Sequence, residues 1–194
     1  MPRERTFTEA DVIDCAADLF AVHGYGGTSV SMLTDATGLG KQSLYNAFGD
    51  KQALYLQAME CAVARYGAVA ARMTAAPDGR TALALFCEHL VTLCASGEPA
   101  RQACIVSSGL LEGIDDPAIR ATLRTKWHAT HELLRAHVER GQRDGSIANP
   151  TPSATLADLF MSMMSGLRVA SRADASPARL SAITHLNLAL LDHR

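Results

Sequence analysis

The sequence contains no long apolar run and no stretch of strictly alternating apolar and polar residues. No segment approaches the ~20 uncharged residues that a membrane-spanning helix needs, so we expect a protein that does not enter the membrane. The missing alternation argues against β-strands. The charged N-terminal segment lacks the apolar core and small-residue cleavage site of a secretory signal, and we therefore expect a cytoplasmic protein.

Paired cysteines are also lacking. The five cysteines are an odd number and none stands in a C-x-x-C pair, which argues against a disulfide framework and a zinc knuckle. We expect five small, mostly buried apolar residues whose thiols stay reduced. Cys87 and Cys94 fall near one face of a predicted helix, so a thiol switch or a soft-metal pair is an alternative that the sequence leaves open.

The chain has no strong excess of positive charge. Its formal net charge is -2, and within residues 1–55 the acidic residues outnumber the four basic ones, Arg3, Arg5, Lys41 and Lys51. A broad basic surface is therefore excluded for this segment. If it binds nucleic acid, it does so through a few well-placed groups, and the affinity depends on dimerisation.

Helical periodicity runs through the whole chain and predicts an all-α fold of about nine helices. Thr8 and Asp11 resemble a capping box that starts the first helix. Glycine- and proline-bearing breaks separate the later ones. The predicted helices cover about 8–23, 30–37, 41–48, 51–75, 80–96, 100–112, 117–142, 153–172 and 177–192.

The segment 28–51 predicts two short helices joined by a tight turn, the arrangement that places a second helix in the major groove of DNA. Ser29 and Thr28 can cap the first helix, and Gly38 stands where a left-handed backbone is easiest for glycine. The residues expected to face inward are Met32, Leu33, Ala36, Leu44 and Phe48, with Leu39 at the corner.

The remaining residues of the second helix are polar or short. They are Lys41, Gln42, Ser43, Tyr45 and Asn46. Glutamine and asparagine can pair with adenine edges, and lysine can reach guanine or phosphate. Lys51 stands at the start of the next predicted helix, where its charge and the free backbone amides can hold a phosphate.

At these residues the chain resembles the tetracycline-repressor (TetR) family of transcriptional regulators. The run GLGKQSLYNAFGDK at 38–51 is similar to that family's recognition helix and its junction with the next helix. Thr34 departs from the pattern, which usually carries alanine at the helix crossing. The positions that match the family's DNA contacts are Ser31, Lys41, Gln42, Ser43, Tyr45, Asn46 and Lys51.

The resemblance extends over nearly the whole chain and implies a two-part molecule. A DNA-binding head would occupy residues 1–50, and an effector-binding and dimerisation domain residues 51–194. Within it, 51–75 would be a connecting helix, and 153–192 would pair with a second copy. The partners implied are double-stranded operator DNA, a second chain and an unidentified small molecule. Candidate pocket residues are Tyr66, Phe86, Cys104, Trp127, His128, His131 and Met163.

We expect no cofactor, no metal and no catalytic residues. No serine–histidine–aspartate or paired-carboxylate arrangement can be located in the sequence. His128 and His131 could ligate a metal, but no carboxylate or cysteine stands at matching spacing. A helical enzyme or carrier with a vestigial helix-turn-helix is the rival class, and it would bind or turn over a small molecule without binding DNA.

Overall fold

The computed structural model describes residues 8–193, and every regular element within them is helical. The prediction of an all-α fold is confirmed. The described chain divides into two compact units. Unit 1 contains the residues up to Arg65 together with Ala103–Arg124, and unit 2 contains Tyr66–Gln102 and the residues from Thr125 onward. None of the helices formed by residues 8–193 is long and apolar enough to cross a membrane.

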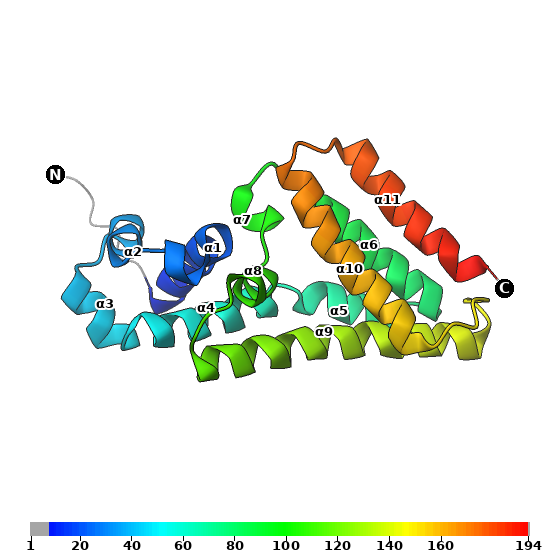
Figure 1. The fold of residues 1–194 in the computed structure, drawn as a ribbon, viewed down its shortest axis with the longest axis horizontal. Coiled ribbons are helices and arrows are strands. Elements are labelled where there is room, and N and C mark those ends of the chain that lie inside the picture. The colour runs from blue at the N-terminus through cyan, green and yellow to red at the C-terminus, as the bar shows by residue number, and fades with distance from the viewer. Residues whose placement is uncertain (1–7, 194) are drawn as a thin grey trace. The chain divides into compact units, whose positions relative to one another are not determined.

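Unit 1 is built around its first helix, which contacts the three helices α2, α4 and α8. The predicted capping box is present, because Thr8 accepts a hydrogen bond from the Asp11 amide and Asp11 accepts one from the Thr8 amide. Phe20 is fully buried and meets the Tyr55 ring edge-on at 4.9 Å. The helices of unit 1 are α1 (Glu9–Gly27), α2 (Val30–Thr37), α3 (Lys41–Phe48), α4 (Lys51–Ala64) and α8 (Ile105–Glu112), shown in Figure 1.

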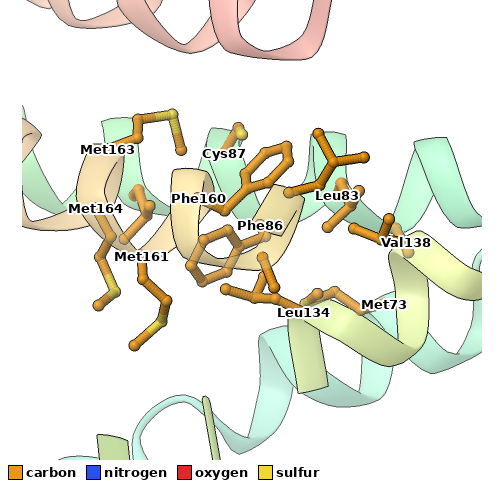
Figure 2. Packing of buried hydrophobic residues seen from close by; sticks show 14 of the residues in the cluster. Met73, Leu83, Phe86, Cys87, Leu134, Val138, Phe160, Met161, Met163 and Met164 are labelled. Atoms are coloured by element: carbon orange, nitrogen blue, oxygen red, sulfur yellow. The ribbon is translucent and has the colours of Figure 1, made fainter. Parts of the chain in front are cut away.

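Unit 2 is centred on α6, which contacts α5, α7, α10 and α11. Phe86 on α6 and Phe160 on α10 lie in one buried apolar cluster with three methionines of α10, as Figure 2 shows. The helices of unit 2 are α5 (Gly67–Ala75), α6 (Gly79–Cys94), α7 (Pro99–Gln102), α10 (Ser153–Arg172) and α11 (Pro177–Ala189), followed by a 3-10 turn (Leu190–Asp192). Helix α9 (Pro117–Asp144) contributes its first residues to unit 1 and the others to unit 2.

The structure interrupts two helices that the sequence predicts as continuous. The first, expected over 51–75, breaks between α4 and α5. Arg65 forms ion pairs with Asp14 and Asp18 in unit 1, whereas the hydroxyl of the following Tyr66 accepts a hydrogen bond from Arg168 in unit 2. Neighbouring residues are thus held in different units, and the helix ends there. The local apolar pattern carries no signal for this break.

The second break divides the helix expected over 100–112 into α7 and α8. Arg168 donates to the carbonyl oxygens of Arg101 and Gln102 at 3.4 Å, so these acceptors are used outside the helix. Cys104 then takes an extended backbone conformation (φ -137°, ψ 112°) ahead of α8. A buried side chain distant in sequence therefore binds the carbonyl end of α7.

At Gly79, the start of α6 lies directly against the backbone of α9. A β-carbon added to Gly79 would lie 2.2 Å from the Gly141 nitrogen and 2.4 Å from the His137 carbonyl oxygen. Asp78 caps α6 by accepting a hydrogen bond from the Thr81 amide at 2.7 Å. The start of α6 is therefore fixed against the backbone of α9.

Candidate nucleic-acid interface

Helices α2 and α3 form the predicted helix-turn-helix, with the predicted bounds. Ser29 caps α2 by accepting a hydrogen bond from the Met32 amide at 3.1 Å. Gly38 takes the left-handed conformation (φ 71°, ψ 4°), and its amide donates to the Thr34 carbonyl at 2.9 Å. A side chain at this φ would be strained, which explains the glycine at the turn.

The inner face of the motif holds α2 and α3 on unit 1. Leu33, Leu44 and Phe48 are buried as expected, but the prediction for Ala36 is wrong because Ala36 is exposed. Thr37 takes the inward position instead. Its hydroxyl donates to the Leu33 carbonyl at 2.7 Å, so a polar side chain is buried with its hydrogen bond made.

Thr34 lies partly buried at the helix crossing, where the TetR pattern usually carries alanine. Its hydroxyl donates to the Ser31 carbonyl one turn earlier, at 2.8 Å. The extra polar group is therefore satisfied within its own helix. The departure from the family pattern leaves the turn geometry intact.

The outer face of α3 is open to solvent. Lys41, Gln42, Ser43 and Asn46 are exposed, and Tyr45 is half-buried. The Gln42 amide nitrogen donates to the Asn46 side-chain oxygen at 2.8 Å. The Gln42 side-chain oxygen and the Asn46 side-chain nitrogen do not take part in that bond. This hydrophilic surface has the donors and acceptors that base edges require.

Two further predicted contacts lie outside α3. Ser31 is exposed on α2 and its hydroxyl lies 3.3 Å from an Asp35 carboxylate oxygen. Lys51 begins α4, and its ammonium lies 4.6 Å from the centre of the Tyr25 ring. Burial lowers the pKa of Lys51, whereas the nearby Glu112 carboxylate acts in the opposite direction. Asp50 caps the same helix by accepting from the Ala53 amide at 2.8 Å.

The predicted pocket residues are divided between the two units. Phe86 and Met163 belong to the buried cluster of unit 2, and Tyr66 and Trp127 pack against it. Cys104 belongs to unit 1. His131 is partly buried and lies 3.3 Å from Asp158, whereas His128 is exposed.

Arg168, which is not among the site residues predicted from the sequence, is 5% exposed within the apolar helix α10. Its guanidinium donates to the Tyr66 hydroxyl and to backbone carbonyls of α7. An arginine in an otherwise apolar stretch is a detectable signal in the sequence, but its partners come from distant segments.

The cysteine alternative receives no support from the environment of its thiols. Cys87 and Cys94 are buried in α6. Burial raises the pKa of Cys87 to about 12 and raises that of Cys94. The reactive thiolate is therefore disfavoured at both positions. Among residues 8–193, no three histidine, cysteine or acidic side chains are grouped so that they could hold a metal ion.

Comparison with known proteins gives one consistent result. The sequence profile for "Bacterial regulatory proteins, tetR family" matches residues 12–58, which contain the helix-turn-helix. The uncharacterized HTH-type transcriptional regulator YezE of Bacillus subtilis is 27% identical over 99% of this chain and 100% of its own. The HTH-type transcriptional repressor ComR of Escherichia coli is 24% identical over 97% of this chain and 90% of its own.

A solved structure extends the similarity to the fold of nearly the whole chain. It is a cysteine mutant of the TetR family transcriptional regulator CifR, complexed with 26-base-pair double-strand operator DNA. Its TM-score is 0.83 at 28% sequence identity, covering 97% of this chain and 99% of that one. Similarity therefore spans the helix-turn-helix and the helices that follow it.

Proposed function

The chain belongs to the TetR family of bacterial transcriptional regulators, and we propose that it is a repressor that binds a palindromic operator as a homodimer. The observation that carries the proposal is the hydrophilic outer face of α3, which unit 1 holds in solvent while Leu44 and Phe48 anchor the inner face. The complex of CifR with its operator supports the same use of this motif. Because operator DNA lies in the cytoplasm of a bacterial cell, we place the protein there.

We assign the DNA contacts by chemistry. Gln42 and Asn46 carry the amide groups that read adenine edges, and Lys41 can reach guanine or phosphate. Ser31, Ser43, Tyr45 and Lys51 would bind the sugar-phosphate backbone, since hydroxyl and ammonium groups commonly serve this purpose. In a dimer, the two α3 helices would enter successive major grooves ~34–36 Å apart.

Removing two backbone contacts tests this assignment. We expect Tyr45→Ala combined with Lys51→Ala to abolish the gel shift that the wild-type protein gives with duplexes enriched from a random-sequence library. The reason is that each dimer loses four phosphate contacts, and a lost Lys51 contact weakens binding to every sequence about equally. Arg143→Ala removes a charge from an exposed site on α9 and should bind like wild type. Wild-type protein that shifts no duplex would contradict the proposed function.

We propose that α10 and α11 form the dimer interface. Both helices carry apolar residues that the single chain leaves in solvent. Val169 on α10 is 68% exposed and Leu186 on α11 is 67% exposed. Because α10 and α11 contact each other, a second chain laid along them could cover apolar side chains of both helices.

A charged substitution on α11 tests whether this helix lies in the dimer interface. We expect Leu186→Glu to convert the dimer into a monomer in size-exclusion chromatography with light scattering, because two carboxylates would be desolvated in a symmetric contact. Leu111→Glu is the matched control, since Leu111 is 87% exposed in unit 1. A Leu186→Glu protein that keeps the dimer mass would exclude α11 from the interface.

We further propose that a small apolar effector binds unit 2 within the cluster containing Phe86 and Met163, bordered by Tyr66 and Trp127. Flexible methionine side chains suit a cavity that adapts to its ligand. The effector would favour a dimer whose heads are wrongly spaced for the operator. The coupling must be reciprocal, so operator DNA should weaken effector binding by the same factor.

A further inference from the structure

A carboxylate of α8 binds the backbone at the end of α1. Gly24 interrupts α1 with a positive φ of 76°, and the next two amides, of Tyr25 and Gly26, both donate to Glu112. The Tyr25 bond measures 2.7 Å. Consecutive backbone N–H groups at such a bend form a concave anion site, and bonds to an ionised acceptor are stronger than neutral ones. Helix α8 lies against α1 in unit 1 (Figure 1).

The two glycines provide the space for this carboxylate. A β-carbon on Gly24 would lie 2.8 Å from one Glu112 oxygen, and one on Gly26 would lie 2.7 Å from the other. Glu112 is also the last residue of α8, where a negative charge is unfavourable for the helix because the carbonyl end is already negative. Its position is explained by the contact with α1 rather than by the stability of its own helix.

The same contact reaches the start of α4. The Tyr25 ring contacts the Tyr55 ring, with centroids 5.0 Å apart, and the Lys51 ammonium lies 4.6 Å from the centre of the Tyr25 ring. Glu112 raises the pKa of Lys51 against the effect of burial, which places the carboxylate within electrostatic reach of that ammonium. Tyr55 in turn donates to the Ile105 carbonyl at the start of α8, at 3.4 Å.

We propose that Glu112 is a positioning residue for operator binding, which fixes the end of α1 and, through the Tyr25 ring, the ammonium of Lys51. The inference rests on the proposed function, because it assigns Lys51 to an operator phosphate. Glu112 itself does not contact DNA in this arrangement. Its role is to hold the Lys51 ammonium, before DNA binds, in the position from which it can contact the phosphate.

Glu112→Gln tests the proposal with little change in shape. Glutamine offers one acceptor oxygen to two amides, so one of the bonds to α1 is lost. We expect operator affinity to fall about tenfold, within the usual range for coupling between sites. The negative slope of log affinity against log salt concentration should become shallower by about 0.9 for each head, because one phosphate contact is lost. Asp115→Asn removes a charge from a nearby side chain that forms an ion pair with Arg120, and should change neither quantity.

Gly26→Ala should also break the contact between Glu112 and the end of α1. The new methyl group would displace the flexible end of Glu112 without removing its charge. The proposal requires this variant to match Glu112→Gln, and requires Glu112→Gln to add nothing further in a Lys51→Ala background. Thermal midpoints equal to wild type would show that unit 1 stays folded.

The outcomes separate this inference from the proposed function. If wild-type protein binds no enriched duplex, both are overturned. If wild type binds and Glu112→Gln keeps its affinity and salt slope, only the positioning role fails. A lower affinity with an unchanged slope, or full additivity with Lys51→Ala, would assign Glu112 a purely structural role and also overturn the inference.

Discussion

Replacing Gly79 with alanine is expected to lower the free energy of unfolding by about 3 kcal/mol, the upper part of the usual range for overpacking a close contact. The added carbon would lie 2.2 Å from the Gly141 nitrogen and 2.4 Å from the His137 carbonyl. Both neighbours are backbone atoms of α9, so no side-chain rotation can make room. Helices α6 and α9 would have to separate, which would expose the buried apolar cluster of unit 2 (Figure 2).

Urea denaturation at one fixed protein concentration measures this effect, since dimer stability depends on concentration. Gly67→Ala is the matched control, because it lies at the start of α5 in the same unit and a β-carbon there meets nothing within 4 Å. It should leave stability unchanged or slightly raised. A Gly79→Ala protein as stable as wild type would mean that the close α6–α9 crossing is wrong.

The second large effect is expected on operator recognition. Replacing both Gln42 and Asn46 with alanine should weaken operator binding by about 4 kcal/mol per dimer, roughly 1000-fold, since each lost base contact costs ~1–3 kcal/mol and each dimer presents two copies of α3. The two side chains are exposed and hydrogen-bonded to each other at 2.8 Å. Their removal leaves the buried anchors Leu44 and Phe48 in place.

The loss should be confined to the specific site. The affinity of the double variant for unrelated duplex DNA depends on phosphate contacts and should stay near the wild-type value. Lys41→Ala, in contrast, is expected to weaken binding to the operator and to unrelated duplexes alike if Lys41 reaches phosphate. Fluorescence anisotropy with an enriched duplex and a scrambled duplex separates the two cases. Equal losses on both duplexes would show that Gln42 and Asn46 do not read bases.

The sequence predicts the head more accurately than the rest of the chain. Its caps and turn are local: Thr8 with Asp11, Ser29 and Gly38 define helix ends through bonds within a few residues. The error at Ala36 has a different origin, because the sequence pattern favours apolar residues inward and cannot anticipate that Thr37 satisfies its hydroxyl within α2. Hydrogen bonds of this kind depend on geometry as well as residue type.

Amino-acid sequence alone determined that the chain is helical and where α2 and α3 begin and end, because capping residues and glycine turns act over a few bonds. It also determined which side chains of α3 are polar. Only the tertiary structure decided where α4 and α7 stop, how closely α6 approaches α9, and that Glu112 binds the end of α1. These features depend on pairs of residues far apart in the chain, such as Arg168 with Tyr66, whose meeting no local pattern encodes.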